Sequence, residues 1–199
     1  MIDDMDYHID AWFEIVNNLG ADLTRDRVKS ECYGKNYELI DRIFPGRFTD
    51  DEKHSMSLEK EKAYQQAFRP KLKLIRGLDA TLAKAKDAGI KMAIGSAAIR
   101  FNIDFVLDGL GIRHYFDAIV SADDVSNSKP DPETFSRCAR QLAVDPSECL
   151  VFEDVPKGVE SAQLAGMDAV VILGIHQAGE FSQYDNIIGF IRDYELTGW

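Results

Sequence analysis

Residues 149–158 have the sequence Cys-Leu-Val-Phe-Glu-Asp-Val-Pro-Lys-Gly, in which an apolar run leads directly into two carboxylates and a proline-containing turn. An apolar run this short is typical of a strand that is buried on both faces of a parallel sheet. The sequence predicts three more such strands, at residues 91–95, 118–120 and 168–173. Helical patterns lie between them, at residues 78–88, 99–110, 132–142 and 157–165. Strands that alternate with helices predict an α/β fold with a doubly wound parallel sheet.

The first part of the chain differs, because helical patterns follow one another there with almost no strand signal. In residues 3–19, Ile9, Trp12 and Val16 recur at helical spacing. Further helices are predicted, at residues 25–32, 36–43 and 50–68, and the basic stretch 69–77 indicates a returning linker. The sequence therefore predicts an all-helical module that precedes the α/β domain or is inserted into it.

Composition limits the classes of function. The 199 residues carry a formal net charge of −11, which repels phosphate backbones and anionic lipids, so we expect neither nucleic acid nor a membrane as partner. No window approaches 18 consecutive apolar residues, and the N-terminus is acidic where a signal peptide would be basic, so we expect a cytoplasmic protein. The three cysteines and four histidines show no metal-binding spacing, so no zinc site is expected.

Ligands of an open α/β sheet bind beyond the carboxyl ends of its strands, so the residues that follow each strand are site candidates. Ser96 and Ala97 lie in a small-residue loop, where a hydroxyl and backbone N–H groups suit an anionic oxygen, or where Ser96 simply caps a helix. Lys129 precedes two prolines and suits a phosphoryl group or a carboxylate; a solvated loop lysine is the alternative. Glu153 and Asp154 repel each other, which indicates a compensating cation or strong donors, unless Asp154 only caps the next helix.

Together these sites resemble those of the haloacid dehalogenase-like phosphotransferase superfamily: Ser96 after a strand, Lys129 in Ser-Lys-Pro-Asp-Pro, and Phe-Glu-Asp-x-x-x-Gly at residues 152–158. The branch that the chain resembles has a small helical cap and includes β-phosphoglucomutase-like proteins and sugar-phosphate phosphatases. The likeness covers nearly the whole chain, including an opening Asp-x-x-x-x-His-x-x-Ala-Trp pattern at residues 3–12. It implies a Rossmann-like core at residues 1–3 and 74–199 and an all-helical cap domain at residues 4–73.

The resemblance also implies roles for the residues at the strand ends. Ser96, together with Ala97, would bind the transferring phosphoryl group, and Lys129 would neutralise charge on that group and on the nucleophile. Glu153 and Asp154 would bind Mg²⁺ directly or through water, because this ion prefers hard oxygen ligands and retains waters.

Within the cap, the resemblance assigns two further residues. Lys35 would contact the substrate, and His8 would couple cap closure to proton transfer, or would only cap and pack against Trp12. Around Lys35 and Lys62 there is no arginine at the offset that β-phosphoglucomutases use for a second phosphate. Phosphomonoester hydrolysis is therefore favoured over mutase activity.

The sequence departs from the family in its nucleophile. The family uses an aspartate of an Asp-x-Asp-Gly-Thr motif at the end of a central strand, and these 199 residues lack that motif. Because Met1-Ile2-Asp3 matches the segment after the motif, we expect the strand to lie upstream of Met1, between the strands that end at Ser96 and Glu153. Its absence would leave two unpaired strand edges. A rival interpretation is a pseudoenzyme whose gap is filled by a partner or a swapped segment.

The sequence thus predicts a Mg²⁺-dependent phosphatase that hydrolyses a small phosphomonoester, such as a sugar phosphate, through an aspartyl-phosphate on the upstream aspartate. Its partner would be a small phosphorylated metabolite, and the protein would be a monomer or a weak homodimer. The alternatives are a β-phosphoglucomutase-type phosphotransferase and a catalytically dead phosphate-binding or interaction module.

Overall fold

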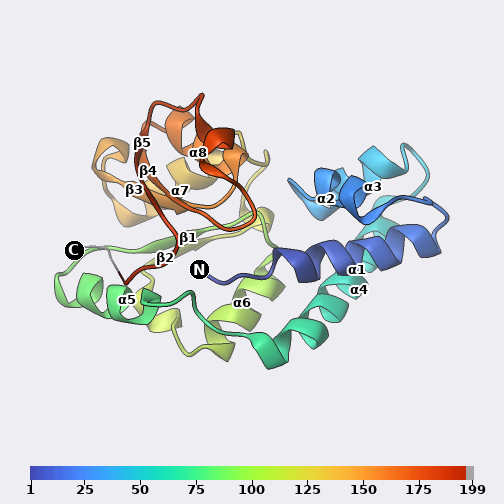
Figure 1. Ribbon diagram of the computed structural model, residues 1–199, viewed down its shortest axis with the longest axis horizontal. Coiled ribbons are helices and arrows are strands. Elements are labelled where there is room, and N and C mark those ends of the chain that lie inside the picture. The colour runs from blue at the N-terminus through green and yellow to red at the C-terminus, as the bar shows by residue number, and fades with distance from the viewer. Residues whose placement is uncertain (196–199) are drawn as a thin grey trace. The chain divides into compact units, whose positions relative to one another are not determined.

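The computed structural model describes residues 1–195 of the chain. These residues form two compact units, an α/β unit made of Met1–Ile2 with the chain from Lys73 onward, and a helical unit made of Asp3–Leu72. Figure 1 shows the strands within the first unit and the first four helices within the second. No helix of the described residues is long and apolar enough to cross a membrane.

The helical unit contains four α-helices and one short 3-10 helix: α1 (Met5–Asn18), α2 (Arg25–Glu31), α3 (Asn36–Ile43), α4 (Asp50–Phe68) and η1 (Arg69–Lys71). Helix α1 packs against α2 and α4, and α3 packs against α4. Its apolar core is formed by Trp12, Val16, Val28, Leu39, Ile40 and Phe44. Helix α4 begins with a capping box, in which Thr49 and Glu52 each accept a hydrogen bond from the other's backbone N–H. The predicted bounds of α3 and α4 are confirmed.

The α/β unit contains five strands, all paired in parallel: β1 (Ala93–Gly95), β2 (Ala118–Val120), β3 (Leu150–Glu153), β4 (Asp168–Ile172) and β5 (Ile187–Ile191). They form two sheets, one of β1 and β2 and one in the order β3-β4-β5. In the described part of the chain, β1 pairs only with β2 and β3 only with β4. The α/β class with parallel strands is confirmed, and β5 is a strand that the sequence patterns did not predict.

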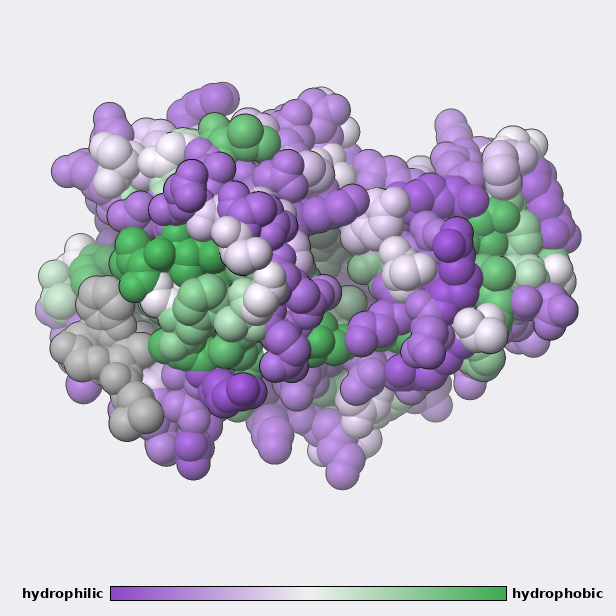
Figure 2. Space-filling model, turned by 45° about the horizontal axis from the view of Figure 1, so that its top comes forward, coloured by the Kyte–Doolittle hydropathy of each residue, from purple (hydrophilic) through white to green (hydrophobic). Residues whose placement is uncertain are grey.

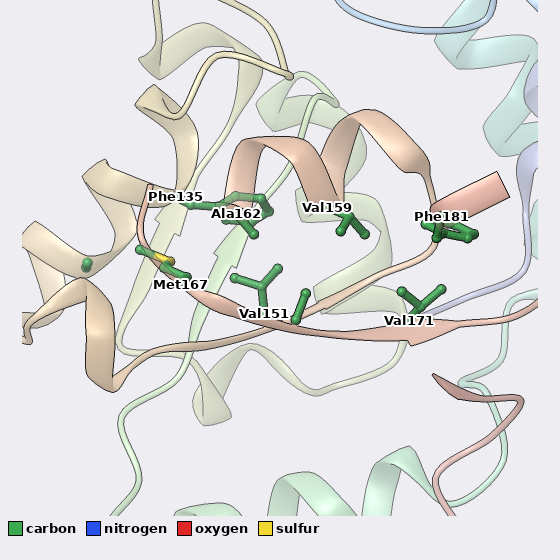
Figure 3. Close-up of a cluster of buried hydrophobic side chains, with 9 residues drawn as sticks. Phe135, Val151, Val159, Ala162, Met167, Val171 and Phe181 are labelled. Carbon is green, nitrogen blue, oxygen red and sulfur yellow. The ribbon is translucent and has the colours of Figure 1, made fainter. Parts of the chain in front are cut away.

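Helices cover both faces of the strands. The four α-helices are α5 (Leu78–Asp87), α6 (Arg100–Gly109), α7 (Glu133–Leu142) and α8 (Pro156–Leu164). Short 3-10 helices lie in the connections, at η2 (Arg113–Tyr115), η3 (Ala122–Asp124), η4 (Pro146–Glu148) and η5 (Ala178–Phe181). In Figure 3, Val159 and Ala162 of α8 lie over Val151 and Val171 of the strands, in a buried cluster with Phe135 of α7. The other face packs against α5 and α6, through one cluster with Ile172 and a second with Ile94 and Ile119. This arrangement places the carboxyl ends of the strands beside the N-termini of α6 and α8.

The segment that returns from the helical unit is held by both ends of the described chain. Ile75 N donates to Met1 O over 2.9 Å, and Tyr194 N donates to Arg76 O over 2.9 Å. The guanidinium of Arg76 also contacts the carboxylate of Asp193 at 2.6 Å. Gly77 follows with φ +80°, where a side chain would meet the backbone of residues 194 and 195.

The face of the molecule seen in Figure 2 is largely hydrophilic. In Figure 2, hydrophilic side chains cover most of the visible face and apolar ones gather in smaller patches. The three cysteines, Cys32, Cys138 and Cys149, are free thiols. Burial raises the pKa of Cys138 to about 12 and that of Cys32 to about 11, which keeps both protonated and unreactive.

Candidate active site

A buried ion pair between Lys129 and Glu153 lies at the carboxyl end of β3. The ammonium group of Lys129 donates to Oε1 of Glu153, and the two side chains are 12% and 7% exposed. The other carboxylate oxygen, Oε2, accepts from the backbone N–H groups of Asp154 and Val155 at 2.9 and 3.3 Å. The alternative of a solvated loop lysine is therefore wrong.

The charge state of Glu153 follows from these contacts. Burial alone would raise its pKa, but the positive charge of Lys129 and the donated hydrogen bonds outweigh burial and lower the pKa below its ordinary value. A buried carboxylate with this pKa remains ionised at neutral pH. Glu153 therefore holds the ammonium of Lys129 at a fixed point above the strand ends.

Helix α8 is shaped to admit this carboxylate. A Cβ added to Gly158 would lie 2.1 to 2.5 Å from the carboxyl atoms of Glu153. Only a residue without a side chain allows the first turn of α8 to approach so closely. The glycine of the Phe-Glu-Asp-x-x-x-Gly pattern is thus explained by the packing of Glu153.

Asp154 has a different environment from its neighbour. It is exposed at the molecular surface, and helix α8 has Val155 as its N-cap with no side-chain cap, so the alternative that Asp154 only caps the helix is wrong. Desolvation of its carboxyl group, together with the negative charge of Glu153, raises the pKa of Asp154 to about 6. This carboxylate therefore carries negative charge that the described residues leave poorly compensated. Such a group favours a cation beside it.

The loop that carries Lys129 is held by hydrogen bonds to residues of helices α7 and α8. Glu133 accepts from the backbone N–H groups of Ser126 and Asn127, each over 2.9 Å. The carbonyl of Asp131 accepts from the hydroxyl of Ser161 on α8 over 2.8 Å. These contacts fix the loop to α7 and α8, so Lys129 is presented from a rigid base.

Ser96 lies at the end of the neighbouring strand β1. Its N–H donates to Val120 O over 2.9 Å, which extends the β1–β2 ladder by one residue. Its hydroxyl accepts from Ala98 N over 3.1 Å, while the N-cap of α6 is Ile99. Ser96 is therefore part of a turn, and the alternative that it caps the helix is wrong.

Phe135 connects the strand end of β1 with the ion pair. A Cβ on Gly95 would lie 3.1 Å from its ring, and Lys129 Nζ lies 4.8 Å from the ring centroid. Ala97, the second residue of the predicted phosphoryl loop, is exposed beyond this point. Lys129 and Glu153 are thus in direct contact, Asp154 follows Glu153 in the chain, and the ring of Phe135 lies against both Lys129 and Gly95, the residue before Ser96.

A second polar cluster lies inside the helical unit, between α1 and α4. Lys60 Nζ lies 2.6 Å from His8 Nδ1 and 3.0 Å from Glu61 Oε1, and Lys60 and Glu61 are 3% and 2% exposed. The ring of His8 stacks on Tyr64 with centroids 3.8 Å apart, and Tyr64 donates to Asp4. His8 therefore packs against Tyr64, and not against Trp12 as one of the two alternatives for this residue had it.

Lys60 and Glu61 were missed by sequence reasoning, which named Lys62 instead. Lys62 is exposed on the opposite side of α4, whereas Lys60 carries the buried charge. Lys35 is half-buried at the start of α3, where its backbone N donates to Glu38 Oε2 over 2.9 Å. Burial lowers the pKa of Lys60, although Glu61 opposes this shift. In the described residues, no group of three or more His, Cys, Asp or Glu side chains could hold a metal ion.

The α/β fold agrees with the comparisons to known proteins. Residues 1–172 match the family model of haloacid dehalogenase-like hydrolases, and the chain belongs to this family. Its fold is that of a haloacid dehalogenase-like hydrolase of the β-phosphoglucomutase-like type.

Individual relatives are similar over most of their length. The fructose-1-phosphate phosphatase YqaB of Escherichia coli is 31% identical over 82% of this chain and 86% of its own. The β-phosphoglucomutase of Bacillus subtilis is 32% identical over 98% of this chain and 87% of its own. The crystal structure of β-phosphoglucomutase from Clostridium difficile superposes with a TM-score of 0.81 at 27% identity, over 94% of this chain and 84% of that one.

Proposed function

We propose that the protein hydrolyses a small phosphomonoester, in particular a sugar phosphate, by phosphoryl transfer to an aspartate and then to water. The observation that carries this proposal is the Lys129–Glu153 pair with Asp154 beside it at the end of β3. An ammonium group held rigidly there can stabilise the charge of a phosphoryl group in transfer. The relatives named as a fructose-1-phosphate phosphatase and as a β-phosphoglucomutase support the substrate class.

One carboxylate at the strand ends, that of Asp154, suits Mg²⁺ with waters completing its coordination. Asp154 offers one carboxylate with a raised pKa and solvent access, while both oxygens of Glu153 are already engaged by Lys129 and two backbone N–H groups. We assign Asp154 as the ligand of the ion and Glu153 as the residue that positions Lys129. Mg²⁺ is commonly held by one or two carboxylates and several waters, and it would neutralise charge on the phosphoryl oxygens.

The aspartate nucleophile would lie at the end of a further strand, placed between β1 and β3. Each of these strands has one edge without a partner strand in residues 1–195, and both lead into site residues. A parallel strand inserted there would end beside Ser96 and Lys129, which is where an attacking aspartate is required. Ser96 and the backbone of Ala97 would then bind a phosphoryl oxygen.

For the helical unit we propose the role of a substrate-selecting cap. His8 and Lys35 contribute polar groups to it, and the buried Lys60 adds a positive charge. The proposal favours hydrolysis over mutase chemistry because Arg42 and Arg47 are engaged in contacts within the unit. A small phosphorylated metabolite is then the partner.

The test is to express the protein with the residues encoded upstream of Met1 and to measure phosphate release from a panel of sugar, polyol and nucleotide phosphates with and without Mg²⁺. We expect Mg²⁺-dependent turnover that an Asp154→Asn variant loses by at least about 10²-fold. The matched control is Asp168→Asn. Asp168 is the first residue of β4 and therefore lies away from the carboxyl ends of the strands. If the upstream-extended protein is inert towards the panel, or if the upstream sequence lacks an Asp-x-Asp-Gly-Thr strand, the catalytically dead module becomes the correct interpretation. Formation of glucose 6-phosphate from β-glucose 1-phosphate would identify the mutase.

A further inference from the structure

Strand β5 lies at the edge of the sheet β3-β4-β5, and in the described residues it pairs only with β4 (Figure 1). Its five residues, Ile-Ile-Gly-Phe-Ile, include no charge and no proline. Ile188 is 57% exposed and Phe190 is 45% exposed. Natural proteins protect edge strands with charged residues or proline, because an unprotected edge offers its backbone groups to another strand. The sequence of β5 is therefore suited to pairing with a partner strand.

A register shift between β4 and β5 decides which side chains of β5 share a face of the sheet. Ile187 pairs with Ala169 and Phe190 pairs with Val171, while Ile188 is the extra residue at the shift. Because Ala169 and Val171 both belong to the cluster under α8, Ile187 and Phe190 lie on that same face although they are three positions apart.

The two ends of this uncharged strand carry opposite charges. Asp185 precedes β5 by two positions and Arg192 follows it directly, and both residues are exposed. Among the residues that the structure describes, neither side chain has an ion-pair partner. The extended chain between them spans about 23 Å, so the two charges of one chain are too far apart to pair with each other.

These features make the edge complementary to a second copy of itself. Consider an antiparallel pair about a twofold axis, in which Ile188 of each chain lies opposite Gly189 of the other. Ile187 then faces the partner's Phe190 on the same side of the sheet, and Asp185 faces the partner's Arg192 at both ends of the pair. An in-register parallel pair would instead bring like charges together at each end.

We propose that two copies of this chain associate through the free edge of β5, antiparallel about a twofold axis, and so join their sheets into one. An edge of five residues is only about 17 Å long. An interface of this size is small and transient, so the dimer forms and dissociates with concentration. The proposal concerns association alone and does not depend on the phosphatase function proposed above.

Sedimentation velocity of the 199-residue chain, at about 5–500 µM protein and about 0.15 M salt, tests the proposal. Salt at this concentration screens the net charge of −11 beyond about 8 Å but leaves charges in contact able to attract each other. We expect an equilibrium between monomer and dimer with a dissociation constant of about 10–100 µM. A chain that is monomeric at every concentration overturns the proposal.

Two charge reversals test the register of the pair. Asp185→Arg places a positive charge opposite the partner's Arg192, and Arg192→Asp places a negative charge opposite the partner's Asp185. Each variant alone should therefore dimerise at least about tenfold more weakly than the parent chain. When the two variants are mixed, opposite charges meet again at both ends, and the mixture should dimerise like the parent chain. The matched control is Asp87→Arg, at an exposed aspartate of α5, which should keep the parent dissociation constant.

The mixture also guards against loss of folding in the variants. Recovery of the dimer on mixing shows that both single variants are folded, because an unfolded chain cannot rebuild the interface. If association persists in the separate variants, or if it does not return when they are mixed, it comes from another surface, and the assignment to β5 is wrong.

Discussion

The Nδ1 atom of His8 lies 2.6 Å from Nζ of Lys60, and its Nε2 atom lies 3.3 Å from the carboxylate of Asp4. Since an ammonium group can only donate, Nδ1 of His8 must accept, and the ring is the neutral form with its proton on Nε2. That proton points to Asp4. The half-buried His8 of the helical unit is therefore held between a cation and an anion in one defined tautomer.

This arrangement predicts a pH-dependent stability. Burial and the charge of Lys60 lower the pKa of His8, against the opposing effect of Asp4 and Glu61. Because the unfolded chain binds the proton more readily, the contribution of neutral His8 is complete above pH about 6.5 and is lost as the pH falls towards the folded-state pKa. We expect chemical denaturation to show falling stability between pH 7 and 5.

The variant that isolates this effect is His8→Gln, whose amide accepts from Lys60 and does not titrate. Its stability should vary less over that pH range than the stability of the parent protein. His54→Gln, at an exposed histidine of α4, is the control and should keep the parent slope. Equal slopes in the parent and His8→Gln proteins would contradict the neutral assignment.

Gly77 allows a test of how the end of the chain packs on the returning segment. It adopts φ +80°, and an added Cβ would lie 2.7 Å from Glu195 N and 2.8 Å from Tyr194 C. Gly77→Ala should therefore cost backbone strain plus overpacking, about 2–4 kcal/mol together. Gly89→Ala is a matched control, since Gly89 has φ +71° with nothing within 4 Å of its Cβ position.

The difference in thermal midpoint between these two variants measures the packing part alone. We expect Gly77→Ala to melt several degrees below Gly89→Ala, at about 2–4 °C per kcal/mol for a chain of this size. Identical midpoints would show that residues 194–195 yield without cost.

Gly158 tests the packing of Glu153 in the same way. A methyl group there would overlap the Glu153 carboxyl, so Gly158→Ala must displace Glu153 and with it the ammonium of Lys129. We expect a destabilisation of about 1–3 kcal/mol from overpacking. Activity on the best substrate of the panel should fall about 10²-fold from misplacement of the charge. Gly179→Ala, whose Cβ position is open, is the control and should change neither.

Local patterns in the sequence predicted much of the α/β unit. The apolar runs at β2 and β3 give strands because they are too short for helices and are bounded by turn residues. Strand β5 was missed because Gly189 interrupts its apolar run, Ile-Ile-Gly-Phe-Ile. The strand forms because it pairs with β4, which the local sequence does not reveal. The bounds of α3 and α4 were predictable because Gly34 and the pair Pro45-Gly46 interrupt the helical pattern on either side of α3.

The contacts within the site were less predictable, since they join residues that are distant in the chain. Lys129 and Glu153 were both identified as candidates, but their direct pairing depends on how β2, β3 and α7 pack. Lys60 and Glu61 are adjacent charges in a strongly polar helix, which is the usual pattern of a solvated face. That face is covered because His8 of α1 packs against Lys60 and Tyr64 of α4.

The last prediction concerns the coupling between Glu153 and Asp154. Glu153→Gln keeps the shape of the side chain and an oxygen to accept from the backbone. It removes the negative charge that, after desolvation, is the second cause that raises the pKa of Asp154 to about 6. The pKa of Asp154 should fall towards its ordinary value of 3.8 but remain above it, because desolvation persists. Carboxyl chemical shifts followed by NMR titration in metal-free buffer measure this directly. Glu148→Gln, at the opposite end of β3, should leave the titration of Asp154 unchanged. An unchanged Asp154 titration in Glu153→Gln would mean that desolvation alone sets the pKa of Asp154. The argument that repulsion from Glu153 favours a cation beside Asp154 would then fail.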